Sequence, residues 1–268
     1  MKTECLELAA KESDPSRRLN ALREYAQSMT LFSLHQSEAF SSISFVGGTA
    51  LRFLFALPRY SEDLDFSLES ADAYEPAKWL RKLKRDLEFM GFTPEITWND
   101  KRIVHTGWIK FPGLLKEAGL AALPSQKLSI KLEIDSKPPA GAKMETQVVR
   151  LHRLMALRHH TLPCLMAGKI RAILTRPFPK GRDWYDLMWY LSRRPPTVPD
   201  IAFLQSSLDQ GSQKAGHEGN EWEKLLLEKL SGLKAGALLK DVAPFLENPG
   251  EGEFLNSEYL RQALRAIP

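Results

Sequence analysis

Two short groups of residues near the start of the chain have the types and the order needed to handle a triphosphate. Gly47 and Gly48 leave a turn without side chains, so the backbone amides can approach an anionic ligand closely. Thr49 follows and is suited to cap the start of a helix, where free amides favour a phosphate. Asp63 and Asp65 come next, and carboxylates two residues apart on a strand share one face. Together they predict nucleotidyl transfer, in which a hydroxyl attacks a nucleoside triphosphate and pyrophosphate leaves.

The paired carboxylates predict a magnesium site, because Mg²⁺ prefers oxygen ligands and combines one or two carboxylates with substrate phosphates. We predict that Asp63 and Asp65 bind Mg²⁺, or Mn²⁺ in its place. A third carboxylate is expected from the alternating strand at residues 127–135. Glu133 is the first choice and Asp135 the second, and either would also accept the proton of the attacking hydroxyl. The competing interpretation is a solvated strand face with mixed charge.

The elements that must position these groups can be predicted from hydrophobic periodicity. An apolar strand at residues 43–46, a short helix at 50–57 and an alternating strand at 62–68 would place the turn and the carboxylates at one end of a compact unit. Outside this unit we expect a helix within residues 14–40 that starts at Asp14 and Pro15, a helix over residues 79–90, one or two strands within residues 94–111, and a loop or short helix at 112–124.

A third group of charged residues lies further along the chain. Lys169 and Arg176 share one face of a predicted helix, and Asp183 falls in the first turn of the next helix. Asp183 could pair with either cation and direct it toward a nucleotide phosphate. A purely structural, salt-bridged helix pair is the alternative, and the sequence leaves both interpretations open.

Composition limits the remaining choices. The chain has 268 residues and a net charge of +4, which permits a polyanionic partner without requiring one. Its two cysteines lack metal-ligand spacing, and its six histidines, including His159 and His160, are interpreted as surface or ordinary polar positions. The N-terminus does not resemble a signal peptide, and no segment has the roughly 18 apolar residues of a membrane span. We therefore expect a cytoplasmic protein without membrane contact.

The end of the chain has a different character from the rest. A proline-bearing linker at residues 193–196 precedes three predicted helices at 201–208, 221–233 and 258–266, which polar, glycine-containing loops separate. The predicted fold is α/β (α+β), with a catalytic lobe and an N-terminal helix in residues 1–150, built on a mixed sheet. A helical lobe in residues 151–268 follows.

Four motifs within residues 43–192 occur together in one order. They are Gly47-Gly48-Thr49-Ala50-Leu51-Arg52, Arg59-Tyr60-Ser61-Glu62-Asp63-Leu64-Asp65-Phe66, Lys131-Leu132-Glu133-Ile134, and the Lys169 to Arg176 helix with Arg182-Asp183-Trp184-Tyr185-Asp186-Leu187. In these motifs the chain resembles the AbiEii/AbiGii toxin family of nucleotidyltransferases, which includes the MenT-type toxins. The resemblance implies a DNA polymerase β-like nucleotidyltransferase fold.

The resemblance also implies roles for individual residues. Asp63 and Asp65 would bind the metal ions, while Lys169 and Asp183 match a lysine and an aspartate that the family needs for activity. The residues expected to contact the nucleotide are Gly47, Gly48, Thr49, Arg52, Ser61, Lys131 and Arg176.

By the same resemblance, the enzyme would move nucleotides from an NTP to an RNA acceptor, expected to be the 3′ end of tRNA, as a toxin with a cognate antitoxin. Two alternatives remain: transfer to a small hydroxyl compound such as an aminoglycoside-like antibiotic, and a catalytically silent nucleotide-binding protein. A basic groove would favour RNA, whereas a closed acidic pocket would favour a cationic small molecule.

Overall fold

The computed structural model describes residues 1–210, 218–233 and 235–266. Its internal contacts divide the chain into two compact units. Unit 1 comprises Met1–Ala56, Tyr60–Pro138 and Glu145–His159, and unit 2 comprises Leu57–Arg59, Pro139–Met144 and His160–Pro268. The boundary between the two lobes that was predicted at residues 150 and 151 stays a prediction.

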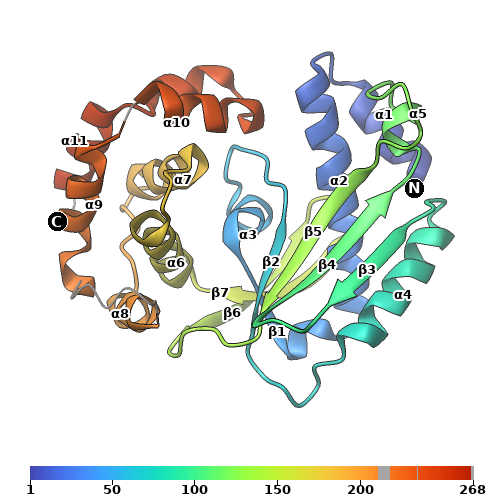
Figure 1. Ribbon diagram of the computed structural model, residues 1–268, viewed down its shortest axis with the longest axis horizontal. Helices are drawn as coiled ribbons and strands as arrows, with labels where there is room; N and C mark the ends of the chain where they lie inside the picture. Colours follow the sequence, from blue (N-terminus) through green and yellow to red (C-terminus); the bar gives the residue numbers. More distant parts are fainter. Residues whose placement is uncertain (211–217, 234, 267–268) are drawn as a thin grey trace. The chain divides into compact units, whose positions relative to one another are not determined.

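Unit 1 is built on a seven-stranded sheet with the order β3-β4-β5-β2-β1-β7-β6 (Figure 1). Strand β2 pairs antiparallel with β1 and parallel with β5, so the sheet is mixed, as the sequence predicted. The strands are β1 (Ile43–Val46), β2 (Leu64–Leu68), β3 (Glu95–Asn99), β4 (Val104–Phe111), β5 (Leu128–Asp135), β6 (Met144–Arg150) and β7 (Leu154–His160).

The helices of unit 1 begin where the sequence supplies start signals. The Asp14 side chain accepts a hydrogen bond from the Arg17 amide and caps α2, whose first residue, Pro15, has the backbone angle that a helix start requires. Helices α2 and α4 pack against each other, and α3 packs against β1 and β2. The α-helices are α1 (Lys2–Ala10), α2 (Pro15–Gln36), α3 (Gly47–Phe55), α4 (Pro76–Phe89) and α5 (Leu114–Glu117), with a 3-10 turn, η1 (Ala39–Ser41).

The core of unit 1 confirms the predicted periodicities. Burial alternates along β5, where the even-numbered residues from Leu128 to Ile134 are buried and the odd-numbered ones are partly exposed. Helix α4 buries Trp79, Leu83 and Leu87 on one side, as helical spacing requires. Burying these side chains fixes the register of β5 and therefore the face on which its charged residues lie.

Unit 2 is helical. Helices α6 and α7 pack together, and α8, α9, α10 and α11 form an arc around them (Figure 1). The α-helices are α6 (Leu162–Thr175), α7 (Gly181–Ser192), α8 (Ile201–Asp209), α9 (Trp222–Ser231), α10 (Ala235–Val242) and α11 (Ser257–Arg265), with the 3-10 turns η2 (Gly219–Glu221), η3 (Ala243–Phe245) and η4 (Pro249–Phe254). The predicted helical C-terminal lobe is confirmed. Among the described residues, no helix combines the length and apolar character needed to cross a bilayer.

Some features of the fold differ from the sequence interpretation. His159 and His160 are buried rather than at the surface, because β7 pairs with β1 and His160 packs against the Phe203 ring. Helices α1 and α10 and strands β6 and β7 were not predicted, and β6 is mostly exposed, so it lacks the alternation that marks a half-buried strand. The predicted loop after α8 falls partly at residues 211–217, outside the described residues.

Candidate functional site

The glycine turn and the acidic strand lie against each other in unit 1. Gly47 follows β1 with a backbone φ of +79°, a conformation that L side chains rarely adopt. A Cβ at this position would collide with Oδ2 of Asp65, because the register of β1 and β2 places Val46 opposite Asp65. A glycine at residue 47 therefore leaves room for the Asp65 carboxylate directly beside the turn.

The parallel pairing of β2 and β5 decides which acidic residue neighbours Asp65. Glu133 is the register partner of Asp65, whereas Asp135 is the partner of Ser67, which is buried. The register thus makes Glu133 rather than Asp135 the neighbour of Asp65, and the role of Glu133 as the third carboxylate stays a prediction. Glu133 forms an ion pair with Lys131 at 2.7 Å, so these two predicted site residues contact each other.

The segment that leads into β2 is fixed through its backbone carbonyl groups. The Gln27 amide nitrogen, on α2, donates hydrogen bonds to the carbonyl oxygens of Ser61 at 3.1 Å and Glu62 at 2.9 Å. The Thr49 hydroxyl donates to the next carbonyl, that of Asp63. Three successive carbonyl groups are therefore held by two side chains, and this arrangement restrains the backbone of the first predicted metal ligand.

This arrangement corrects one prediction. Thr49 is not the N-cap of α3, because the helix begins at Gly47 and Val46 occupies the capping position. Since Thr49 is already inside the helix, its hydroxyl is used to hold the Asp63 carbonyl rather than to cap the helix. A phosphate contact by Gly47, Gly48 or Thr49 stays a prediction, in which the backbone amides rather than the hydroxyl would supply the donors.

Arg52 points to α2 and to the segment before β2. Its guanidinium forms a 2.6 Å ion pair with Glu24 and lies 4.8 Å from the ring centre of Tyr60. Nucleotide contacts by Arg52, Ser61 and Lys131 stay predictions. In the structure Arg52 and Glu24 brace the chain next to the candidate metal ligands.

The donor set in unit 1 fits a divalent cation. Asp63 and Asp65 supply carboxylate oxygens, the ligands that Mg²⁺ prefers, and one or two of them suffice when substrate phosphates complete the coordination. Across the described ranges, no group of three acidic, histidine or cysteine side chains is already gathered as a metal site. The third carboxylate, Glu133, is therefore a neighbour by strand register rather than a preassembled ligand.

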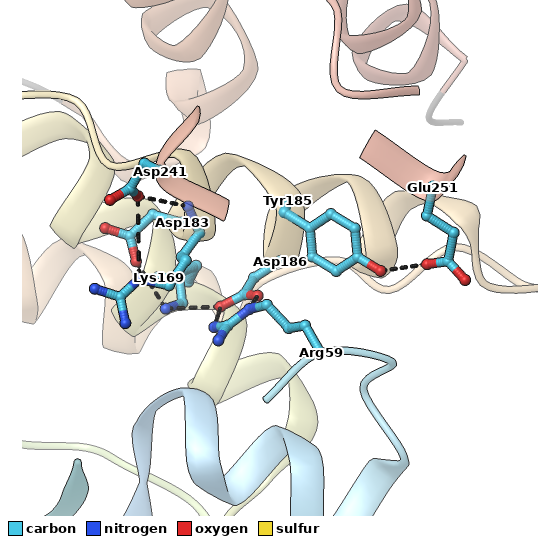
Figure 2. A network of polar contacts seen from close by, with 8 residues as sticks. Arg59, Lys169, Asp183, Tyr185, Asp186, Asp241 and Glu251 are labelled. Atoms are coloured by element: carbon cyan, nitrogen blue, oxygen red, sulfur yellow. Dashed lines mark hydrogen bonds and ion pairs between the residues drawn. The ribbon is translucent and has the colours of Figure 1, made fainter. Parts of the chain in front are cut away.

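Unit 2 contains the other predicted site residues in one buried cluster of charges (Figure 2). The Lys169 ammonium lies 2.9 Å from Asp183 Oδ1 and 2.9 Å from Asp186 Oδ2. Arg176, just after α6, approaches the second Asp183 oxygen at 3.3 Å. Arg59 holds Asp186 with two hydrogen bonds of 2.6 Å, from Nε to Oδ1 and from Nη2 to Oδ2. Asp183 was expected to pair with one of the two cations, and it contacts both Lys169 and Arg176.

The charges in this cluster stabilise one another against the cost of burial. Burial lowers the pKa of Lys169, but Asp183 and Asp186 outweigh it, so the pKa is raised. Burial raises the pKa of Asp183, but Lys169 and Arg176 outweigh it, so the pKa is lowered. Lys169 is therefore a cation and Asp183 an anion throughout the physiological pH range.

Sequence reasoning did not single out Gln27, Arg59 or Asp186. Arg59 and Asp186 lie inside motifs that were noticed, but they are 127 positions apart and share no periodicity that could have paired them. Gln27 lies within Tyr25–Leu31 of α2, a stretch in which every residue is buried, and Ser28 and Thr30 beside it are buried and polar too, so no local pattern distinguishes it. Each of these residues contacts a predicted site residue or the segment that carries one.

A mixed sheet with a glycine turn beside a carboxylate strand, accompanied by a helical unit, defines an α/β protein of the nucleotidyltransferase type. The family model for the nucleotidyl transferase AbiEii toxin of type IV toxin-antitoxin systems matches residues 30–262. The chain therefore belongs to the AbiEii family, and the resemblance seen in its motifs is confirmed.

Two solved structures from Helicobacter pylori are similar to the chain. The protein JHP933 has 19% sequence identity and a TM-score of 0.49, with coverage of 92% of this chain and 91% of that chain. A candidate nucleotidyltransferase has 18% identity and a TM-score of 0.46, with coverage of 92% and 96%. No curated protein matches the chain.

Proposed function

We propose that this protein transfers nucleotides from an NTP to an RNA acceptor, the 3′ end of tRNA, with release of pyrophosphate. The observation that carries the proposal is the position of the Asp65 carboxylate, which lies against the bare Gly47 turn and has Glu133 as its neighbour on the next strand. Membership of the AbiEii nucleotidyltransferase family supports the same reaction.

Some residues of unit 1 would bind the metal ion and the triphosphate, and others restrain the backbone that carries them. Asp63 and Asp65, with Glu133 beside them, would hold Mg²⁺, or Mn²⁺ in its place, which when bound lowers the pKa of the attacking hydroxyl and neutralises the leaving pyrophosphate. The amides at the start of α3 are suited to the triphosphate oxygens because Gly47 and Gly48 carry no side chains of their own. Gln27 and Thr49 keep the backbone before β2 in one conformation while substrates enter and leave.

A hollow in unit 2 bears on the choice of acceptor. It has a volume of about 740 Å³, and its lining includes the rings of Trp189, Phe254 and Tyr259. Glu251 is the one carboxylate among the described lining residues, and it accepts a hydrogen bond from Tyr185. A polycationic amino sugar is better matched by several carboxylates, whereas an unpaired RNA base stacks on aromatic rings. The lining of this hollow therefore suits an unpaired RNA base better than an aminoglycoside-like cation.

The biological role follows from the family. We propose a toxin that acts in the cytoplasm and has a cognate antitoxin, because the matching family model describes toxins of toxin-antitoxin systems. Blocking the 3′ end of tRNA would stop translation.

The test is to incubate the purified protein with each α-labelled NTP, MgCl₂ and total RNA, and to separate the products on a denaturing gel. We expect label in the tRNA band for the wild type. Asp65→Ala removes a predicted metal ligand and should abolish labelling. Asp72→Ala, which removes an exposed carboxylate from the segment after β2, is the matched control and should label as the wild type does.

Three outcomes discriminate among the hypotheses. A hydroxyl-bearing small molecule can be added to the same assay. Label on this molecule alone, with none on RNA, would favour the small-acceptor alternative. NTP binding without any turnover would favour a silent nucleotide-binding protein. Equal labelling by Asp65→Ala and the wild type would disprove the role given to the acidic strand.

A further inference from the structure

We propose that Asp186 is a positioning residue for the nucleotidyl transfer reaction: with Arg59 as its partner, it fixes the ammonium group of Lys169 in one place as a phosphate-binding cation. This inference rests on the proposed function. It adds two residues, Asp186 and Arg59, that neither the motifs nor the family match had assigned a role.

The geometry gives Asp186 two partners at once. Its Oδ2 atom accepts a hydrogen bond from Arg59 Nη2 at 2.6 Å and forms an ion pair with Lys169 Nζ at 2.9 Å, while its Oδ1 atom accepts from Arg59 Nε. Asp186 has no exposed surface and Arg59 is 2% exposed, whereas the Lys169 side chain retains 12%. Of these three side chains, that of Lys169 keeps the largest exposed fraction.

Arg59 determines the net charge of the cluster around Lys169. Without it, the lysine would face two carboxylates, Asp183 and Asp186, and its charge would be more than cancelled. Arg59 donates two short hydrogen bonds to Asp186, so the arginine balances the charge of this carboxylate. With Arg176 beside Asp183, three cations then face two carboxylates, and one positive charge remains in the cluster. That excess suits a polyanionic phosphate chain.

The alternative is that the cluster only holds the helices of unit 2 together. Buried ion pairs are weak evidence for stability, because desolvation of both partners can cost as much as their attraction provides. A chain that only needed packing here could place apolar residues at positions 59 and 186. The two hypotheses therefore make different predictions for a variant that removes both charges and keeps the volume.

Two variants and one control test the inference. Asp186→Asn removes the carboxylate charge, and Arg59→Met with Asp186→Leu removes the whole pair without leaving either charge unpaired. The control is Asp241→Asn, because Asp241 accepts a hydrogen bond from the Arg182 amide at the start of α7 and is not one of the described carboxylates paired with Lys169 (Figure 2). Circular dichroism and thermal unfolding report whether each variant folds.

The first measurement is steady-state kinetics with a saturating RNA acceptor. For the double variant we expect a KM for the NTP that is raised roughly tenfold or more, because Lys169 loses one of its two anchors, with a smaller change in kcat. The control variant should keep the wild-type KM. A folded double variant with wild-type KM and kcat would overturn the inference and assign the pair to stability alone.

The second measurement follows the Lys169 ammonium directly, by NMR of isotope-labelled lysine side chains across a pH titration. The charged groups that face it are Asp183 and Asp186 on α7, Arg59, and Arg176 after α6. Since the two carboxylates raise the pKa of Lys169, Asp186→Asn should lower it, and the alkaline limb of the kcat/KM profile should move to lower pH. An unchanged pKa would overturn the inference even if no NTP is turned over, which separates it from failure of the proposed function.

Discussion

Replacing Gly47 by alanine should damage catalysis far more than stability. The added methyl group has two consequences. The residue must keep a φ of +79°, which for a non-glycine residue costs about 1 to 2 kcal/mol. The new Cβ also collides with Oδ2 of Asp65, and since this oxygen ends a movable side chain, we expect the carboxylate to swing away from the turn rather than the sheet to break.

Gly141 provides the matched control. It has a φ of +91°, and an added Cβ there would have no neighbouring atom within 4 Å. Gly141→Ala therefore has a similar backbone cost without displacing a carboxylate. For both variants we expect a melting temperature lowered by roughly 2 to 8 °C, as such costs imply for units of this size.

Activity distinguishes the two variants. We expect nucleotidyl transfer per folded molecule to fall at least roughly a hundredfold in Gly47→Ala, because displacement of a ligand by about 1 Å can have an effect of this size. Gly141→Ala should match the wild type. The assay is the labelled-NTP reaction at a temperature where both variants are folded. Equal activity of the two variants would refute the argument that the turn and Asp65 must fit each other.

Three further predictions follow from the same structure. Gln27→Leu leaves two backbone carbonyl groups without their donor and should lower the unfolding free energy by about 1 to 3 kcal/mol in urea titrations, whereas Gln36→Leu, on the exposed side of the same helix, should change it little. Glu133→Gln should reduce transfer more than Asp135→Asn, because Glu133 is the register partner of Asp65; the reverse order in the labelling assay would identify Asp135 as the third carboxylate. Burial raises the pKa of Asp183, but the neighbouring cations outweigh burial, so the pKa in the folded protein is below the usual 3.8. The ionised Asp183 therefore stabilises the fold above pH 3.8, and this stabilisation is lost as the pH falls through the folded-state pKa. Acid unfolding of the wild type and of Asp183→Asn measures the difference.

The sequence predicted those parts of the molecule that depend on local patterns. The alternation in β5 gave the strand, its buried side and the face of Glu133, because a period of two over eight residues permits one register with an apolar core. The start of α2 was equally local, since Asp14 and Pro15 act within a single turn. In unit 2, the spacing of Lys169 and Arg176 predicted that the two cations share one face, and both contact Asp183.

The parts that could not be predicted depend on contacts between distant residues. Thr49 is a residue type typical of a helix cap, but α3 starts three residues earlier than predicted, and the Thr49 hydroxyl donates to a carbonyl group 14 positions away. His159 and His160 are polar residues interpreted as surface or ordinary polar positions, but the pairing of β7 with β1 buries His159, and His160 packs against the Phe203 ring. In each case a contact between residues distant in the sequence determined the helix start or the burial, and local propensity does not contain information about such contacts.

The residues predicted to touch ligands and the residues that hold them therefore differ in how they can be found. Ligand-binding chemistry needs particular residue types close together, such as two carboxylates on one strand face, so it leaves short motifs. Restraint needs only a donor or a charge at the right place, and it can come from any element: Gln27 reaches across 35 positions to Glu62, and Arg59 across 127 to Asp186. The motif residues would stay in place after loss of such a partner but would gain freedom to move. For that reason the sharpest test of this site lies in Gln27 and Asp186, where a role in positioning predicts altered KM or pH dependence in a protein that still folds.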